Sequence, residues 1–358
     1  MSDAKPSVPG AHVIRHDTLR GIVRNMLTAS GSNAEEAQIV SDHLVDANLA
    51  GHDSHGVGLL PMYMNDRRNN KVHANAHAQL ERDDGPIGIF DGNMGFGHVL
   101  AREATLWGIE KARAGGTAIV ALRNAYHIAR VGTYAEIACA ANLISIFFVN
   151  VVFGAQRVAV FGGTDGRLHT NPICIAVPGN NSHPPFILDF ATSKIAIGKV
   201  RVAYNEKRQL PLGTIIDAKG APSTDPAVIY EEPQGAILPF GEHKGSGLAV
   251  MCELLAGALV GGITNQASTP QDRGLTNNML SILIDPQRFT SDTIFHHEIE
   301  AILKHVTDSP AADPAHPVVT AGEPERQSRA RRLEQGIPID AVTWAGIVAA
   351  AKSVGVTA

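Results

Sequence analysis

A short polar loop near residue 54 holds side chains suited to proton transfer. Residues 51–56 read Gly-His-Asp-Ser-His-Gly and follow a segment with helical periodicity. A histidine gains and loses a proton near neutral pH, and loops on a rigid scaffold commonly carry catalytic groups. The loop therefore predicts an acid–base site. The alternative is a surface loop whose Asp and Ser cap the next turn.

A second polar segment lies between an expected strand and an expected helix. Residues 124–132 read Asn-Ala-Tyr-His-Ile-Ala-Arg-Val-Gly. The N-terminus of a helix that follows a strand attracts anions, and the guanidinium of Arg130 offers a planar fork for a phosphate or carboxylate. The segment predicts an anion site at a sheet edge. A plain connector with a solvated arginine is the alternative.

Three further segments carry weaker signals. Thr170-Asn171-Pro172 follows a glycine-rich stretch, Asp189-Phe190-Ala191 ends an apolar run, and Lys244 lies in a glycine-flanked start of an apolar helix. A lysine at a helix start suits phosphate, although the spacing is not that of a P-loop. Ordinary turns and helix caps use the same residue types.

Two common kinds of site receive no support. No G-x-G-x-x-G follows an expected strand, so the sequence does not predict an ordinary Rossmann dinucleotide site. His52 and His55 have a His-x-x-His spacing, but no H-E-x-x-H helix is present. A metal site therefore has only weak support, and we assign no metal ligands.

The elements that must hold these segments follow from the hydrophobic periodicity. It predicts a helix around 19–27, a second helix from a Ser32 cap to Leu49, and a helix over 132–141. Apolar runs predict strands at 117–122, 143–151, 173–177 and 186–189, with a loop over 123–131. Helix and strand alternate, which indicates an α/β fold. Segments 263–280 and 306–328, rich in turn residues, are expected on the surface, and 1–13 as a loose arm.

Composition excludes several classes of protein. The chain has 358 residues, 44% of them hydrophobic and 18% charged, which is a globular composition. The net charge of −5 gives no footprint for nucleic acid or an anionic membrane. Three cysteines without a C-x-x-C predict neither a disulfide framework nor a zinc ribbon. No secretory signal or membrane span is evident, so we expect a cytoplasmic protein without nucleic-acid or membrane partners.

Taken in order, the segments resemble one family. The chain is similar to the type-2 malate/L-lactate dehydrogenase family over about residues 14–350, and within it to the hydroxycarboxylate dehydrogenase B branch. The motifs that carry the resemblance are GHDSHGVGLLPMY, NAYHIARVG, FGGTDGRLHTNP, LDFATSKIAIGK, LPLGTIIDAKGAPSTDPA, FGEHKGSGLAVMCELLAGALVGG and GEPERQSRARRLEQGIPID.

The resemblance implies a fold and a reaction. The fold is a non-Rossmann α/β fold with a mixed-sheet cofactor domain over residues 122–255. Residues 1–121 and 256–358 form a helix-rich region for dimerisation and substrate binding. The reaction is reversible hydride transfer between NAD or NADP and a small 2-oxo or (S)-2-hydroxy acid. The family usually forms an intertwined homodimer.

The resemblance also implies roles for single residues. His55, oriented by Ser54, and His127 are the candidate acid–base residues, and which of them is essential stays open. Thr170 contacts substrate. The residues expected to line the cofactor are His127, Ile128, Ala129, Arg130, Val131, Asp189, Phe190, Ala191, Lys244, Gly322 and Glu323.

The chain departs from the family at two positions. Many members carry an arginine four residues after the S-H-G histidine, where this chain has Leu59. We therefore expect Arg130, or else Arg167, to bind the substrate carboxylate, and the apolar Leu59 to favour bulkier or aromatic side chains. His169 stands where the family often has glycine before T-N-P. It either narrows the site or faces solvent.

Three other interpretations stay open. The same fold and histidine could reduce a cyclic imino acid, such as a piperideine or pyrroline carboxylate. A metal-dependent hydrolase could use His52, Asp53, His55 and His243. A non-catalytic dimer could keep the fold as a scaffold, although the presence of both His55 and His127 argues against it.

Overall fold

The computed structural model describes residues 11–270 and 273–358. Most of the expected N-terminal arm lies outside these residues. His12–Ile14 forms strand β1, which pairs antiparallel with β14, Ile337–Ile339, so the start of the described chain is joined to its C-terminal region.

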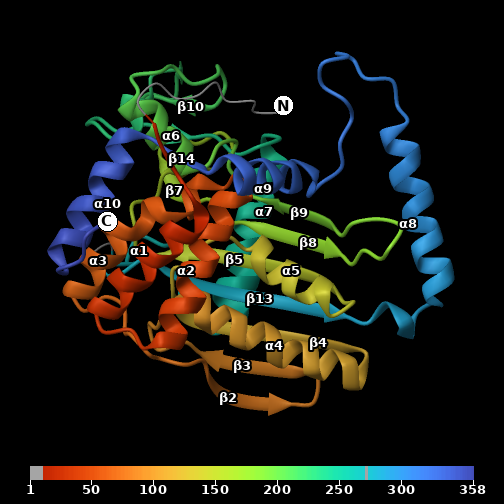
Figure 1. Ribbon diagram of the computed structural model, residues 1–358. Coiled ribbons are helices and arrows are strands. Elements are labelled where there is room, and N and C mark those ends of the chain that lie inside the picture. Colours follow the sequence, from red (N-terminus) through yellow and green to blue (C-terminus); the bar gives the residue numbers. More distant parts are fainter. Residues whose placement is uncertain (1–10, 271–272) are drawn as a thin grey trace.

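A seven-stranded mixed sheet forms the centre of the molecule (Figure 1). Only β3 and β4 are parallel, and the other neighbouring pairs are antiparallel. This mixed sheet with its helices confirms the expected fold class. Its strands, in spatial order, are β2 (Gln79–Asp84), β3 (Ile87–Asp91), β4 (Thr117–Tyr126), β13 (Thr276–Ile284), β5 (Ile144–Val152), β8 (Ile173–Val177) and β9 (Phe186–Phe190).

Two expectations about this sheet are wrong. Segment 263–280 is not wholly on the surface, because its last residues begin β13, which lies between β4 and β5. The polar residues that suggest a loop are bonded inside the sheet: Asn277 Oδ1 accepts from Ile128 N at 2.9 Å, and Asn278 Oδ1 accepts from Asn124 N at 2.9 Å. The loop expected from residue 123 begins later, because β4 pairs with β13 as far as Tyr126.

One edge of the sheet collects the chemically interesting segments. β4, β5 and β9 end at this edge, whereas β13 and β8 begin there, since Thr276 pairs with both Tyr126 and Val152, and Ile173 pairs with Phe190. Segments 127–131, 170–172 and 191–193 therefore meet at the same edge. We call it the site edge.

Helices cover one face of the sheet and extend past the site edge, and residues 255–260 pack on part of the other face. α4, Gly97–Gly115, and α5, Gly132–Ala140, pack on the sheet (Figure 1). A separate helical core forms from α1 (His16–Ala29), α2 (Ala34–Leu49), α3 (Leu60–Arg68) and α10 (Ala341–Ser353). The expected Ser32 cap of α2 is wrong by one residue, because Asn33 Oδ1 accepts from Glu36 N at 2.8 Å.

A second, five-stranded sheet lies beyond the site edge. Its order is β11 (Pro222–Ser223), β10 (Ile215–Ile216), β12 (Ala236–Ile237), β6 (Val158–Ala159) and β7 (Gly166–Leu168). The remaining helices are α6 (Ile197–Asn205), α7 (His243–Cys252), the π-helical turn η4 (Glu253–Leu259), α8 (Asp292–Thr307) and α9 (Glu323–Gln335). α9 begins inside the segment 306–328, which the sequence indicates as irregular. Short 3-10 turns are η1 (Asp53–His55), η2 (Val57–Leu59), η3 (Pro226–Ile229) and η5 (Pro286–Arg288).

The expected domain limits fall inside continuous structure. The limit at 121/122 lies within β4, and the limit at 255/256 lies within η4. The large sheet takes strands from both sides of these limits, so the division into two domains stays a prediction. Among the helices that the structure describes, none has both the length and the apolar character needed to cross a membrane.

Candidate active site at the edge of the large sheet

The turn that carries His55 is fixed by residues far away in the sequence. Arg332 of α9 donates to both carboxylate oxygens of Asp53, at 2.6 and 3.0 Å. Asn48, near the end of α2, donates to Asp53 at 2.7 Å and accepts from Val57 N at 2.8 Å. Gly56 has to be glycine here, because a Cβ atom would lie 2.1 Å from Asn48 Oδ1. These contacts hold η1 and η2 in one geometry.

Ser54 and His55 contact each other at the turn. The Ser54 hydroxyl and His55 Nδ1 are 3.0 Å apart, which leaves Nε2 as the nitrogen free for a ligand. The backbone of α6 rests on Ser54, since a Cβ atom at Gly198 would lie 2.4 Å from Ser54 Cβ. Ser54 and His55 are both partly exposed, so a small molecule can reach them.

His127 lies opposite His55 at the site edge. The two imidazole rings are nearly parallel, with centroids 6.0 Å apart and planes at 19°. His127 directly follows β4, in a turn where Ala129 adopts a left-handed φ of 56°. A non-glycine residue in that region stores strain, which is common at functional sites. The structure thus joins the two histidines that are 72 residues apart in the sequence.

A buried hydroxyl from α3 orients the ring of His127. Tyr63 Oη lies 2.8 Å from His127 Nδ1 and 3.4 Å from Nε2 of the buried His98. A hydroxyl can either donate to Nδ1 or accept from it, so this bond persists when His127 gains or loses a proton. As at His55, Nε2 is the nitrogen that remains for a ligand.

Both histidines are neutral at pH 7 in the free protein. Burial lowers the pKa of His55 to about 3, and the charges of His127, His52 and Arg130 act in the same direction. Burial also lowers the pKa of His127 to about 3, with His98 adding to the effect. An anion placed beside the rings would raise both pKa values, because an opposite charge favours the protonated form.

Arg130 is placed beside the site but is already paired. Its guanidinium, 2% exposed, donates to Glu136 of α5 at 2.8 Å and lies 3.9 Å from Asp189 at the end of β9. Asp189 also accepts from Gly132 N at 2.8 Å. A Cβ atom at Gly132 would lie 2.7 Å from Arg130 Nη2, so the cluster is tightly packed. Arg130 therefore shapes the turn before α5 and does not present a free guanidinium to a substrate.

The ends of β9 and the start of α7 are joined at the same edge. Thr192 donates to the carbonyl of Thr170 through both its backbone N and its hydroxyl, each at 2.9 Å, and its own carbonyl accepts from Phe240 N at 3.0 Å. The rings of Phe190 and Phe240 are 5.5 Å apart. The segment that leads to Lys244 is thereby attached to residues 190–192, next to Ala191.

Four of the predicted residues lie outside this contact network. Gly322 and Glu323 begin α9 beside Pro185 and Ile187, at the opposite end of β9 from Asp189. The exposed guanidinium of Arg167 pairs with Asp165 of its own loop at 2.8 Å. Leu59 is buried in the helical core and does not form an open wall. Their expected roles stay predictions.

His169, the other departure from the family, is partly buried. Its ring lies near Gly154, where a Cβ atom would be 3.3 Å from His169 Cε1. Burial lowers the pKa of His169 to about 4. The side chain therefore packs against a loop and does not simply face solvent.

The residues of the metal-hydrolase interpretation are occupied by other contacts. His52 Nε2 is bonded to Glu325 at 3.0 Å, and Asp53 is held by Arg332. The ring of His243 packs on Phe161, 5.9 Å away. Within residues 11–270 and 273–358, no three His, Cys, Asp or Glu side chains are grouped as metal ligands would be. We do not propose a hydrolase.

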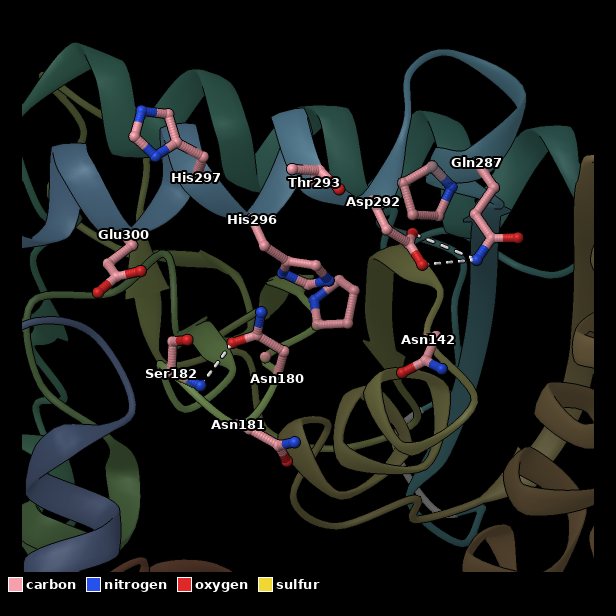
Figure 2. Close-up of a pocket in the computed structure, with 13 residues that line it drawn as sticks. Asn142, Asn180, Asn181, Ser182, Gln287, Asp292, Thr293, His296, His297 and Glu300 are labelled. Atoms are coloured by element: carbon pink, nitrogen blue, oxygen red, sulfur yellow. Dashed lines mark hydrogen bonds between the residues drawn. The ribbon is translucent and has the colours of Figure 1, made fainter.

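A polar cavity lies away from the site edge. It has a volume of about 550 Å³ and is bounded by α8, the loop between β8 and β9, and the turn before β5 (Figure 2). His296 from α8 and His183 from the loop share a 3.1 Å hydrogen bond beside it. None of the predicted site residues lines this cavity, which is polar and holds no stacked histidines. The histidines that the sequence indicates lie at the site edge.

Sequence reasoning missed the residues that support this chemistry. Two of them act over long separations in the sequence: Tyr63 contacts His127 across 64 positions, and Arg332 contacts Asp53 across 279. The other two are local: Asn48 contacts Asp53 across 5 positions, and Glu136 contacts Arg130 across 6. Two of the four lie in motifs that carry the resemblance, Tyr63 in GHDSHGVGLLPMY and Arg332 in GEPERQSRARRLEQGIPID. The rest became visible only through tertiary contacts.

The comparisons with known proteins agree with this geometry. The family model described as malate/L-lactate dehydrogenase matches residues 14–348. Hydroxycarboxylate dehydrogenase B of Escherichia coli strain K12 is 43% identical over 346 residues, which cover 96% of this chain and 95% of that protein.

Solved structures share the fold. The sulfolactate dehydrogenase of Methanocaldococcus jannaschii has a TM-score of 0.85 at 30% identity, covering 97% of this chain and 98% of that one. The delta1-piperideine-2-carboxylate reductase of Pseudomonas syringae pv. tomato has a TM-score of 0.81 at 27% identity, covering 95% and 99%. The resemblance seen in the ordered motifs is confirmed, and the chain belongs to the malate/L-lactate dehydrogenase family of oxidoreductases.

Proposed function

We propose that the protein interconverts 2-oxo acids and (S)-2-hydroxy acids by hydride transfer with NAD or NADP. The observation that carries this proposal is the pair of neutral, partly exposed imidazoles whose rings face each other 6.0 Å apart at the site edge. A carbonyl that receives a hydride needs a proton on its oxygen, and an imidazole can supply that proton and take it back.

The residues around the turn before α5 fit a nicotinamide cofactor. Two buried polar atoms there, Arg130 Nε and Thr133 Oγ1, have no hydrogen-bond partner among the described residues. They lie at the N-terminus of α5, where backbone N–H groups and the helix dipole favour phosphate. Arg130, Thr133 and the backbone of 127–132 would hold the cofactor, with Asp189–Ala191 and Lys244 nearby. When bound, the cofactor supplies the hydride.

The chain's own groups would manage the proton. His55 and His127 each direct Nε2 away from a fixing hydroxyl, Ser54 Oγ and Tyr63 Oη respectively. An anionic substrate beside the two rings raises their pKa values from about 3 toward the pH of the solution, so that a ring can hold a proton. One ring then donates its proton to the carbonyl oxygen in reduction, and accepts it from the hydroxyl in oxidation.

The first experiment measures the loss of nicotinamide absorbance. NADH and NADPH are each tested with aliphatic and aromatic 2-oxo acids and with cyclic imino acids. Turnover of a 2-oxo acid is the expected result, and the preferred side chain identifies the substrate class. If the protein binds neither cofactor and turns over no substrate, the proposal is wrong.

Cyclic imino-acid reduction is the second candidate. The relevant observation is the TM-score of 0.81 with the piperideine-2-carboxylate reductase. A histidine that protonates a carbonyl oxygen can equally protonate the nitrogen of an imine. Turnover of a cyclic imino acid, without turnover of open-chain 2-oxo acids, would replace the leading proposal with this one.

We also propose that the protein forms a homodimer through the face of the large sheet opposite α4 and α5, beside the part of that face that η4 covers. Six apolar residues, one on each of six neighbouring strands, form an aligned row across the sheet. Each residue of the row is directly opposite the next one in the strand register. Ile87, Ile119, Ile175 and Leu188 are 40, 37, 37 and 39% exposed. The row consists of Ile87, Ile119, Ile282, Ile146, Ile175 and Leu188. A continuous apolar row of this kind is typical of a covered surface.

Light scattering tests the dimer. We expect twice the chain mass for the unaltered protein and a monomer for Ile175→Glu. Val342→Glu, which changes a 59% exposed residue on α10, is the control and should stay dimeric. A monomeric unaltered protein would contradict this part of the proposal.

A further inference from the structure

A 2-oxo acid brings a carboxylate that needs a cation near the two histidines. The family position for that cation is Leu59, which is 8% exposed and packed in the helical core. An arginine fork is the group best matched to a carboxylate, because it can make two parallel hydrogen bonds. The chain must therefore supply its cation from another position.

Most arginines around the site are already paired with carboxylates. Arg130 is bonded to Glu136 at 2.8 Å, Arg332 to Asp53 at 2.6 Å, and Arg326 to Glu323 at 2.8 Å. Arg329 lies 3.3 Å from Asp46. Recruiting any of these guanidinium groups would leave a carboxylate without its partner, which costs free energy when the pair is buried.

Arg201 of α6 is different. It is partly buried, and among residues 11–270 and 273–358 no carboxylate is within ion-pair distance of it and no hydrogen bond of its side chain is present. Tyr230 is a titratable group near Arg201. Burial raises the pKa of Tyr230, and the positive charge of Arg201 opposes this rise. A guanidinium in this situation can accept an anionic ligand at little cost.

The position of Arg201 follows from the packing of α6 on the His55 turn. Gly198 rests on Ser54, and Arg201 comes three residues later, on the same face of the helix. Its Nη2 atom lies 3.6 Å from the point that a Cβ atom at Gly58 would occupy. Gly58 is three residues after His55 and next to Leu59. The guanidinium therefore reaches the turn from which the family's arginine would project.

We propose that Arg201 binds the carboxylate of the substrate and replaces the arginine that is missing at position 59. A Cβ atom at Gly58 would lie 3.2 Å from Thr343 Cγ2 and 3.6 Å from Arg201 Nη2. The absence of a side chain at Gly58 therefore leaves room for the guanidinium at the turn. This inference rests on the proposed 2-oxo acid activity. It assigns substrate recognition to α6, while Arg130 stays with the cofactor turn.

The test compares acids with uncharged analogues. Arg201→Leu, Arg201→Lys and the control Arg208→Leu are assayed with the best 2-oxo acid and with its neutral amide. Arg208 lies just beyond α6 and pairs with Glu206 on the surface. For Arg201→Leu we expect kcat/KM for the acid to fall at least about 30-fold, because a charge-assisted pair is lost. Most of the fall should appear in KM.

The amide measures whether the effect belongs to the carboxylate. Its kcat/KM should stay within about 3-fold of the unaltered protein in Arg201→Leu, since the amide never used the charge. Arg201→Lys should lie between the two, because it keeps the charge but loses the fork. Cofactor affinity, followed by nicotinamide fluorescence, should not change in any variant.

The outcomes separate this inference from the proposed activity. If the unaltered protein reduces no 2-oxo acid, the proposed function fails and Arg201 has no carboxylate to bind. If the unaltered protein is active and Arg201→Lys and Arg201→Leu keep its preference for acid over amide, the inference about Arg201 is wrong and the function stands. Arg201→Lys also covers the case in which the leucine variant does not fold.

Discussion

The two histidines of the site are held in opposite ways. His55 takes its orientation from Ser54, its neighbour in the chain, and the short turn that carries both is fastened from outside by Asn48 and Arg332. His127 has no such local partner. Its ring is oriented by Tyr63, which belongs to another helix and a buried aromatic cluster with Phe96, Tyr126 and His98.

This difference separates two kinds of support. At His55, the backbone of the turn is held by ion pairs from α9. Breaking them should lower the stability of the protein and also displace the turn. At His127, the backbone directly follows a central strand, β4, so removing the Tyr63 hydroxyl should affect the ring alone. Four experiments can break or sharpen this comparison.

Removing either imidazole should give the largest effect. For His55→Ala and for His127→Ala we expect the turnover rate with the best oxo acid to fall by about 10²- to 10⁴-fold, the usual contribution of an acid–base group. The larger fall identifies the residue that transfers the proton. His77→Ala, at an exposed histidine paired with Glu103, is the control. Falls below about 10-fold in both variants would remove the two histidines from the chemistry.

Breaking the fastening of the His55 turn should come next. Arg332→Met removes the bidentate partner of Asp53, so we expect the free energy of unfolding to fall by about 3 kcal/mol. This is the lower end of the range for a buried pair, because the Asp53 side chain keeps 32% of its surface exposed. Urea denaturation measures it. Arg326→Met, on the same helix, breaks a pair that is 32 and 34% exposed and should cost under about 1 kcal/mol. Equal losses would refute the special role of Arg332.

Tyr63→Phe should change catalysis more than stability. Loss of one hydrogen bond to the ring, about 1–1.5 kcal/mol, predicts a fall in kcat by about 10-fold with little change in KM. Tyr126→Phe removes a neighbouring buried hydroxyl that donates to Asp66 at 2.8 Å, and should lower stability without changing kcat. If both variants have the same kcat, Tyr63 does not position His127.

The smallest effect is on the pH dependence of folding. The pKa of His127 is about 3 in the folded protein, below its ordinary 6.5. Below pH 6.5 the unfolded chain binds a proton that the folded chain does not, so stability falls as the pH falls from 6.5 toward 3, and this contribution is absent above 6.5. His127→Gln should therefore make the dependence in this window shallower by one proton. Urea unfolding at several pH values measures it.

A surface histidine gives a control of opposite sign. The hydrogen bond that His77 donates to the carboxylate of Glu103 raises the pKa of His77, so its contribution to stability is present at low pH and is lost as the pH rises. His77→Gln should make the loss of stability on acidification steeper. If both variants shift the curve in the same direction, the burial of His127 is not what lowers its pKa.

Much of this arrangement can be predicted from the sequence, and the reasons are physical. The helix from residue 32 to Leu49 and the strands expected at 173–177 and 186–189 follow from local periodicity, and the motif residues His55, His127 and Asp189 are visible as polar groups at the ends of elements. β13 cannot be predicted in this way, because a strand buried between two others need not alternate polar and apolar residues. Its Asn277 and Asn278 resemble turn residues until their partners, Ile128 and Asn124 respectively, are known.

The arginines show the same limit more clearly. Sequence alone tells how many there are but not how they pair, so Arg130, three residues after His127, is expected to be free for the substrate. The glutamate that occupies it lies six residues further on, one turn into α5. Nothing local distinguishes Arg201 from other arginines on a helix. Only the close approach of α6 to Gly58 does so.

The place of β13 has a consequence for how the molecule is made. β4 and β5 flank it, and neither touches the other, so the middle of the sheet stays open until residues 276–284 have left the ribosome. Asn277, which holds the backbone of Ile128 across 149 residues of sequence, arrives with that strand. Pairings over such distances form slowly, and nascent chains with unpaired strand edges are prone to aggregate. A chain stopped before residue 276 would keep both histidines and still lack the strand that holds the turn 127–131 in place.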